Sequence, residues 1–336
     1  MTKINNKQAK VFLNSISKKD KVAIIHDTDL DGYTAAILLY NFCKKNGVRP
    51  KTFGFVRGIS SFRKFGLERF DKILIVDLGS NVFVKESWVF KGKKVFYTDH
   101  HPSDDNFPRN VLELKTKSEI SSAETVFKLI GGTELLKAMA LSADVGSQKP
   151  ENRKQILKYA RSNGLSLDEF FRRVNYRIVR TGIYFHKNPR KVFNILKKIR
   201  TLKDLARLDK YDKKVGSEIE RNLRGFKKKK EMVGKVTYYP FYPRYPIKSA
   251  VITELSFKSP KKTFVFACPK SKDIISLSAR NQTGKVKMND LLKECTKNLK
   301  KSSAGGHDKA SGATIQKKDL KKFKQNLREY SKKLKS

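Results

Sequence analysis

The chain has 336 residues, of which 75 are Lys or Arg and 32 are Asp or Glu, so its net charge at pH 7 is +43. The length suffices for two domains, and a hydrophobic share of 38% can fill their cores. The 22 Phe and 12 Tyr residues, and the alternation of apolar blocks with turns, argue against a wholly disordered basic protein. No apolar run reaches the ~18 residues of a membrane span, and the first residues lack the apolar core of a secretory signal. The three cysteines lie far apart, which excludes a Cys-x-x-Cys metal site and a disulfide scaffold and leads us to expect a cytoplasmic protein.

The positive charge is spread along the whole chain and is not confined to one basic tail. A charge of this size indicates an anionic partner. Neutralising phosphates releases counterions, and nucleic acid is therefore the ligand that such a field favours. An anionic membrane surface is one alternative, but the sequence carries no lipidation motif. A genome-wide preference for lysine is another explanation of the charge.

Short apolar strands alternate with helices in residues 1–150. The predicted strands cover 21–26, 48–56, 73–76 and 94–98, and the predicted helices cover 32–44, 122–129 and 134–141. A capping-box pattern at Ser121 to Glu124 marks the start of the second of these helices. This alternation predicts an α/β fold with a parallel sheet and helices on both faces.

The rest of the chain divides into a connector and a second, smaller α/β domain. Residues 151–237 are charged and mostly helical, so we assign three parts: a domain at 1–150, a helical connector at 151–237 and a domain at 238–336. Strands are predicted at 250–257, 262–269 and 273–280, followed by a helix at 289–298, a Gly-rich turn at 304–312 and a final helix. An apolar stripe on that final helix predicts that it docks on the second domain.

The run Tyr-Tyr-Pro-Phe-Tyr-Pro-Arg-Tyr-Pro at 238–246 allows two interpretations. Its three prolines forbid a helix interior and favour extended chain. Its aromatic rings suit base stacking on a nucleic acid, but a stiff linker with its rings packed inward is the interpretation that we prefer.

Acidic and histidine residues gather where the predicted strands and helices end. The run 26–32, His-Asp-Thr-Asp-Leu-Asp-Gly, follows the first strand, and Asp77 follows the third. The run 99–101, Asp-His-His, follows the fourth strand, and Asp144 follows the helix at 134–141. Because ligands bind at this edge of an open parallel sheet, we expect the four groups to converge.

Converging aspartates repel one another unless a cation lies among them. Imidazole together with carboxylate suits Mn, Zn or Fe better than Ca, so the pattern predicts a site for one or two divalent metal ions. Taken singly, Asp77 or Asp144 is more often a helix cap or turn residue. Four such groups in this order favour the metal site.

The motifs Asp-x-Asp-x-Asp-Gly, Asp, Asp-His-His and Asp, followed by Gly-Gly-His-Asp-Lys-Ala-Ser-Gly at 305–312, resemble the DHH phosphoesterase superfamily. The resemblance covers nearly the full chain, and the second half resembles the DHH-associated substrate-binding domain. The opening motif and the basic charge are more similar to RecJ-type single-strand exonucleases, particularly compact archaeal ones, than to cyclic-dinucleotide phosphodiesterases or pyrophosphatases.

The resemblance implies a site for two Mn²⁺ ions, with Mg²⁺ as the alternative metal. Asp29 and Asp31 would each face one ion, and Asp77 would bridge the two. His100 and Asp144 would complete the coordination.

The resemblance also implies roles for the residues around the metal ligands. His101 would contact the scissile phosphate, and Asp99 would orient a histidine. Family members with a His-x-x-x-Asp-x-Asp opening place a ligand histidine four residues before the first aspartate of that pair, whereas His26 lies three before Asp29. Either His26 or Asp27 is therefore the remaining candidate ligand.

In the second domain the resemblance implies a site for a substrate phosphate. His307 and the backbone amides around Gly305 and Gly306 would hold the phosphate, and Arg280 would contact phosphate or base. The Gly-rich run of the family is often longer than the one present here.

We therefore predict a metal-dependent exonuclease that degrades single-stranded DNA or RNA to mononucleotides, away from any membrane and in contact with replisome or repair proteins. The alternatives are a phosphoesterase for short oligoribonucleotides or 3′-phosphoadenosine phosphate, and a RecJ-like replisome scaffold without catalysis. The charge of +43 argues against the small-substrate enzyme, because a ligand with so few phosphates does not need so wide a field. The presence of all the matching acids and histidines argues against the inactive scaffold.

Overall fold

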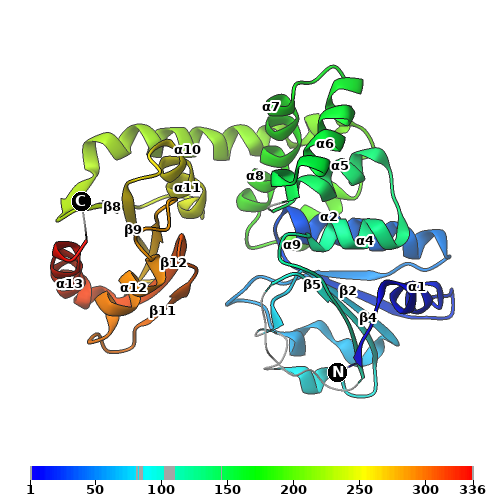
Figure 1. Cartoon of the computed structure of the whole chain (residues 1–336). Helices are drawn as coiled ribbons and strands as arrows, with labels where there is room; N and C mark the ends of the chain where they lie inside the picture. Colours follow the sequence, from blue (N-terminus) through cyan, green and yellow to red (C-terminus); the bar gives the residue numbers. More distant parts are fainter. Residues whose placement is uncertain (1, 81, 83–85, 102–109, 145, 335–336) are drawn as a thin grey trace. The chain divides into compact units, whose positions relative to one another are not determined.

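The computed structural model describes residues 2–80, 82, 86–101, 110–144 and 146–334 (Figure 1). The chain divides into two compact units, Met1–Asp212 and Lys213–Ser336, and each is described by itself. Each unit has its own sheet and its own hydrophobic core.

The first unit contains a parallel sheet of six strands in the order β1-β6-β5-β4-β2-β3, which confirms the predicted α/β fold. Four of the strands follow the predicted apolar runs, whereas β1 and β6 were not predicted. The strands are β1 (Thr2–Lys3), β2 (Val22–His26), β3 (Lys51–Gly54), β4 (Lys72–Val76), β5 (Lys94–Asp99) and β6 (Val111–Lys115).

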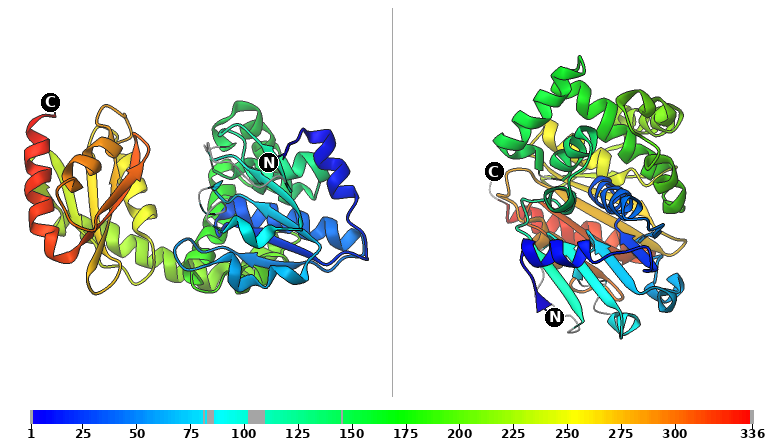
Figure 2. Two further views of the ribbon diagram at one scale, coloured as in Figure 1. Left: turned by 90° about the horizontal axis from the view of Figure 1, so that it is seen from below. Right: turned by 90° about the vertical axis from the view of Figure 1, so that its right-hand side faces the viewer.

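Alternate residues of these strands face two separate cores, because successive side chains of a strand point to opposite faces of the sheet. Ile24 and Leu74 belong to a core that includes the helices α1 (Asn6–Asn14), α2 (Leu30–Lys45) and α4 (Ser122–Ile130). Ile25 and Ile75 belong to the opposite core, which the described residues cover with the short 3-10 helices η1 (Phe62–Phe65), η2 (Leu67–Arg69) and η3 (Ser87–Phe90). Helices were predicted on both faces, and within the described ranges the α-helices cover the first face and short 3-10 helices cover the second (Figure 2).

A run of helices continues the first unit, and those after residue 150 agree with the mostly helical character predicted for that charged region. They are α5 (Glu134–Ser142), α6 (Pro150–Ser162), α7 (Leu167–Phe170), α8 (Arg177–Tyr184) and α9 (Pro189–Leu196), with a π-helical turn at Phe171–Tyr176 and a 3-10 helix, η6, at Leu202–Leu208. Helix α9 packs on β3 and α2, and the long α10 (Asp209–Lys229) runs from the first unit into the second.

The second unit contains a mixed sheet in the order β11-β12-β10-β9-β8-β7. Strands β8 and β9 are parallel, and the other neighbours are antiparallel. The strands are β7 (Glu231–Val233), β8 (Val236–Pro240), β9 (Thr263–Pro269), β10 (Ile274–Arg280), β11 (Ser303–Gly306) and β12 (Ala310–Gln316).

The strand predicted at 250–257 is wrong, because these residues belong to the helix α11 (Lys248–Lys258). Its β-branched residues favour a strand locally, but Ile252 and Ser256 are spaced one helical turn apart and are both buried. Helix α11 packs on β9 and β10. The need to cover that face of the sheet overrides the local preference.

The aromatic run at 238–246 begins inside the second sheet, because its first three residues belong to β8 and not to a linker. Tyr238 and Tyr239 lie in β8 and are buried, and Phe241 is buried directly after it. Tyr239 and Phe241 contact the ring of Phe266, so these rings form a core and are not platforms for bases. Tyr242, by contrast, is 73% exposed.

Two helices, α12 (Met288–Thr296) and α13 (Leu320–Lys332), pack against one another and complete the core of the second unit. The apolar stripe of α13 is docked on this core as predicted, with Phe323 and Leu327 fully buried. No helix in the described part of the chain is long and apolar enough to cross a membrane.

We expect Phe323→Ala to destabilise the second unit by about 3–5 kcal/mol, because it leaves a cavity where a fully buried ring packs. Denaturant unfolding of the full chain measures this change. Lys321→Ala, at an exposed position of the same helix, is the control and should change stability by less than about 0.5 kcal/mol. Equal unfolding midpoints for the two variants would contradict the docked position of α13.

Candidate metal centre

The loop between β2 and α2 carries the first acidic motif. The Asp29 carboxylate accepts a hydrogen bond from the Gly32 amide at 2.9 Å and so caps α2. A Cβ at Gly32 would lie only 2.3 Å from the Asp27 carbonyl oxygen, so this position requires glycine. The tight loop thereby places Asp31 in the first turn of α2.

The buried Asp31 carboxylate is held by the N-terminus of α4. One carboxylate oxygen accepts a hydrogen bond from the Ser122 amide at 2.8 Å, and the other accepts one from the Ala123 amide at 2.7 Å. Unpaired amides at a helix N-terminus favour a negative charge, so they fix Asp31 in its orientation. Ser122 also donates its hydroxyl to an Asp77 oxygen at 3.3 Å.

Asp77 and Asp144 have left-handed backbone conformations, with φ values of 60° and 46°. Lys301 is the one other described residue, glycine apart, with a positive φ. Side chains other than glycine rarely adopt this conformation, and it costs about 1–3 kcal/mol at each position. In both loops the conformation serves to direct a carboxylate toward the same point.

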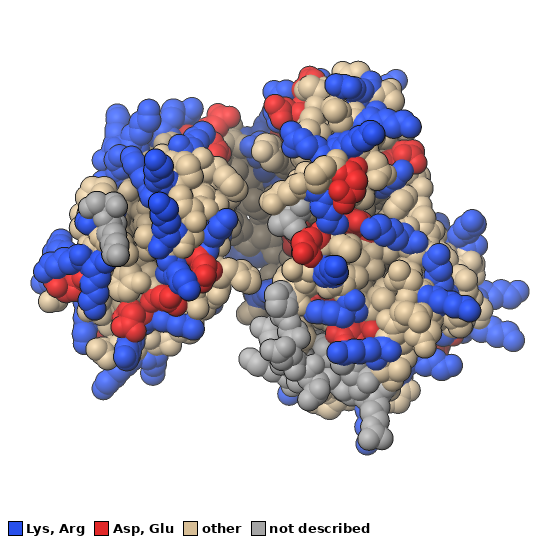
Figure 3. Space-filling view, viewed as in Figure 1, with Lys and Arg blue, Asp and Glu red and all other residues tan. Residues whose placement is uncertain are grey.

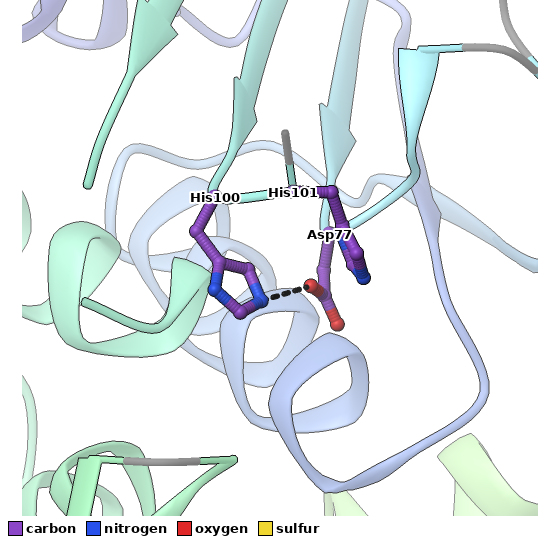
Figure 4. A group of neighbouring side chains, drawn as sticks. All are labelled: Asp77, His100 and His101. Atoms are coloured by element: carbon purple, nitrogen blue, oxygen red, sulfur yellow. Dashed lines mark ion pairs between the residues drawn. The ribbon is translucent and has the colours of Figure 1, made fainter. Parts of the chain in front are cut away.

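The His100 ring lies at that point. Its Nε2 atom is 3.0 Å from an Asp144 oxygen, 3.5 Å from an Asp77 oxygen and 3.7 Å from an Asp31 oxygen. Ligand atoms of these four residues all lie within 4.8 Å of one another. Figure 4 shows the His100 ring pointing at the Asp77 carboxylate from the neighbouring strand.

His101 adjoins the same cluster, and a buried carboxylate orients it. Its Nδ1 atom is 2.7 Å from an oxygen of Asp99, whose other oxygen lies 3.3 Å from the Lys115 ammonium. Burial opposes ionisation of Asp99, but the His101 hydrogen bond and the Lys115 charge hold its pKa below the usual value. Asp77, His100 and His101 form a second group with metal-ligand spacing (Figure 4).

Asp29, His26 and Asp27 were also predicted as metal ligands. Among the described residues, none of the three belongs to either group whose ligand atoms all lie within 4.8 Å of one another. His26 is fully buried, its Nδ1 atom is 2.7 Å from the Asp27 carbonyl, and its ring packs against Tyr33 and Phe193. Asp27 forms a 3.1 Å ion pair with Arg57.

The residues present fit a divalent cation. Asp77 Oδ2 is a buried atom of the cluster without a hydrogen-bond partner, and a metal ion would satisfy such an acceptor. Burial and the neighbouring carboxylates raise the pKa of Asp77, and burial together with the Asp144 charge raises the pKa of Asp31 to about 6. Burial alone would lower the pKa of His100, but Asp144 and the Ser118 carbonyl raise it to about 9. These pKa shifts have the directions that crowded, buried carboxylates produce when no cation neutralises them.

The second unit brings its four predicted residues to one end of its sheet. Gly305 and Gly306 end β11, His307 lies in the exposed turn that follows, and Arg280 pairs in register with Ala310 after that turn. A Cβ at Gly306 would lie 2.7 Å from the Ala310 carbonyl oxygen, and its φ is 141°, so this glycine is required. Gly305 faces open space.

Several residues beside the predicted site residues were not foreseen from the sequence. Ser122 and Ala123 belong to the capping box, which signalled a helix start but not its contact with Asp31. Lys248 in α11 is a further such residue: it donates to the Ser276 hydroxyl at 2.6 Å, and burial lowers its pKa to about 8 beside the charge of Arg280. In a chain with 75 basic residues, a single lysine gives no signal of this kind.

Comparison with protein families agrees with this geometry. Residues 21–158 match the model of the DHH family, N-terminal domain, and residues 244–333 match that of the DHHA1 domain. The chain belongs to the DHH phosphoesterase superfamily. It is therefore a metal-dependent phosphoesterase, and its Asp and His cluster is the divalent metal site of such a hydrolase.

Solved structures share the fold of this DHH protein at low sequence identity. RecJ from Thermus thermophilus in complex with Mn²⁺ has a TM-score of 0.74 and 17% identity, over 98% of this chain and 55% of that one. Exonuclease RecJ bound to manganese has a TM-score of 0.72 and 16% identity, over 99% and 95% of the two chains. The DHH domain of a protein described as a member of a family of ribosomal proteins has a TM-score of 0.75 and 15% identity, over 98% and 91%. The chain thus spans about half the length of the Thermus protein, and no curated protein matches its sequence.

We expect Mn²⁺ to raise the melting temperature of this DHH protein more at pH 8.5 than at pH 5.5. The pKa of Asp31 is raised from 3.8 to about 6, so the free energy of unfolding of the metal-free protein falls as the pH rises through that range. His100, with a pKa raised from 6.5 to about 9, loses its contribution as the pH rises through 9. Mn²⁺ needs the carboxylates ionised and the histidine neutral, so its stabilising effect has the opposite pH dependence.

Thermal unfolding of EDTA-treated protein, with and without Mn²⁺, measures this effect. Asp168→Asn, an exposed acid on α7, is the control and should respond as the wild type does. A melting temperature that Mn²⁺ leaves unchanged at pH 8.5 would contradict the metal centre.

Proposed function

We propose that this phosphoesterase is an exonuclease that hydrolyses single-stranded DNA or RNA to mononucleotides. The observation that carries the proposal is the cluster of Asp31, Asp77, His100 and Asp144 in a chain with a net charge of +43. The cluster supplies phosphodiester chemistry, and the charge supplies affinity for a long polyanion.

The distribution of charge favours a strand over a very small substrate. Figure 3 shows Lys and Arg side chains over both units, with few Asp and Glu side chains among them. A dinucleotide has too few phosphates to use so wide a field, whereas each further phosphate of a strand adds a contact. The net charge therefore argues for a long ligand.

The residues of the cluster divide the chemistry between them. Asp31, Asp77, His100 and Asp144 would hold two divalent ions, with Asp29 facing one of them. Bound ions of this kind supply a water of lowered pKa and stabilise the charge of a phosphoryl transition state. Mn²⁺ is the metal that we propose, with Mg²⁺ as the alternative, and the Mn²⁺-bound RecJ structures of the same fold support this choice.

His101 and Asp99 act together on the substrate in this proposal. The Asp99 carboxylate holds the His101 Nδ1 atom at 2.7 Å, so the opposite nitrogen is available to donate a hydrogen bond to the scissile phosphate. His26 or Asp27 would complete the metal ligands. The second unit would hold another phosphate between the Gly305–Gly306 backbone, His307 and Arg280.

The proposal also covers the setting of the activity. A cytoplasmic enzyme of this kind would act on single strands exposed during replication, repair or RNA turnover, in contact with replisome or repair proteins. The likeness to exonuclease RecJ supports a nucleic-acid substrate.

Single strands labelled at the 5′ or the 3′ end test the proposal. DNA and RNA strands are incubated with the full chain in Mn²⁺ or in EDTA. Release of mononucleotides from one end, abolished by EDTA, is the expected result and also gives the direction of degradation. Cleavage limited to very short oligonucleotides would select the short-oligonucleotide phosphoesterase, and binding without any cleavage would select the scaffold.

We expect Asp77→Ala and His100→Ala each to lower the cleavage rate by about 10³-fold or more, because each removes a metal ligand. Both variants should still bind a single strand, since most of the positive charge is unchanged. Asp168→Ala is the matched control and should keep the wild-type rate. Turnover at the wild-type rate in either cluster variant would refute the assignment of the metal ligands.

A further inference from the structure

A basic pocket lies in the first unit, between α9 and the start of α10, and we call it the α9–α10 pocket. Its volume is about 520 Å³, within the range of small-molecule sites. Five cationic side chains line it: Arg190, Lys191, Lys198, Arg207 and Lys210. None of its lining residues belongs to the metal cluster, so the pocket is a separate feature.

The lining of the α9–α10 pocket contains no carboxylate from the described residues. The nearest acids in sequence are engaged elsewhere, because Asp209 pairs with Arg177 and Asp212 pairs with Arg180, both at 3.0 Å. Among the lining cations, Arg207 pairs with Asp204 at 3.5 Å. Clustered cations repel one another, and an anion in the pocket would relieve that repulsion.

One wall of the pocket is aromatic. Tyr211 is half-buried and packs against Tyr184 and Phe185, with ring centroids 5.0 and 4.7 Å away. Ile195 adds an apolar, half-buried surface from α9. The Lys210 ammonium lies over the Tyr211 ring, 5.0 Å from its centroid. A half-buried tyrosine beside several cations suits a nucleotide, which presents a flat base and a phosphate together.

Helix α9 links this pocket to the metal centre. The buried Phe193 of α9 packs against the His26 ring at 5.6 Å, and Pro189 lies against Gly54 at the end of β3. Arg190 and Lys198, at the two ends of the same segment, are exposed and line the pocket. The pocket is therefore separated from the loop of the first acidic motif by the width of one helix.

We propose that the α9–α10 pocket binds one nucleotide of a single strand, with its phosphate on the cations and its base on Tyr211. The pocket would hold the strand at a distance from the bond that is cleaved, so it would serve long substrates and not dinucleotides. The inference rests on the proposed function, because it assumes a single-stranded nucleic acid as substrate.

The triple variant Arg190→Gln, Lys198→Gln, Lys210→Gln tests this inference. All three positions are exposed and lie outside the core, so the full chain should fold. The control is Lys7→Gln, Lys10→Gln, Lys19→Gln, which removes the same charge from exposed positions. Two of these control residues lie on α1, which packs on β6, whereas α9 packs on β3 at the opposite edge of the sheet.

Two measurements separate the pocket from the metal centre. The first is binding of a single strand of about 20 nucleotides in EDTA, over a range of salt concentrations. The second is the rate of dinucleotide cleavage in Mn²⁺. We expect the pocket variant to bind the strand about tenfold more weakly, and the slope of log affinity against log salt to become shallower by about 0.7 for each phosphate that it no longer neutralises. Dinucleotide cleavage should match that of the control.

The outcomes distinguish the pocket from the proposed function. A wild type that neither binds nor cleaves strands overturns the proposed function. A wild type that does both, with a pocket variant equal to the control in affinity and salt dependence, overturns the pocket alone. Loss of dinucleotide cleavage in the pocket variant would also overturn the pocket proposal. So would a free nucleoside monophosphate that binds the wild type at saturation and is not displaced by the single strand.

Discussion

The carboxylates of Asp31, Asp77 and Asp144 approach one another around the His100 ring, and like charges at this distance repel strongly. The first unit is built to hold them there. Parallel strands bring their carboxyl ends to one edge, the α4 N-terminus fixes Asp31, and left-handed backbone directs the other two. Gathering the charges and straining the backbone cost stability, and a bound cation offsets that cost. The fold therefore creates the repulsion among the carboxylates, and metal binding relieves it.

The sequence was a good guide where local pattern and burial agree. Fully apolar runs such as 73–76 became central strands because both faces of the sheet are covered. It failed at 250–257, where β-branched residues form α11 because the second sheet needs a helix on that face. It also missed β6, whose Glu113 interrupts the apolar pattern, and the two-residue β1, which only pairing with β6 defines.

The candidate site was predictable to the same extent and for a related reason. The order of acids and histidines along the chain suffices to place Asp31, Asp77, His100 and Asp144 at one sheet edge, and the structure brings these four together. Backbone amides have no sequence signature, so the contact of the α4 N-terminus with Asp31 could not be foreseen. The α9–α10 pocket was hidden likewise, because its cations are ordinary members of a lysine-rich chain.

Calorimetric titration of metal-free protein with Mn²⁺ tests the metal centre most directly, since it counts the ions that the carboxylate cluster accepts. We predict two ions per chain at neutral pH, release of protons on binding, and loss of this binding in Asp77→Asn. Asp168→Asn should bind as the wild type does. Absence of Mn²⁺ binding, or binding that Asp77→Asn leaves unchanged, would contradict a metal centre built from these carboxylates.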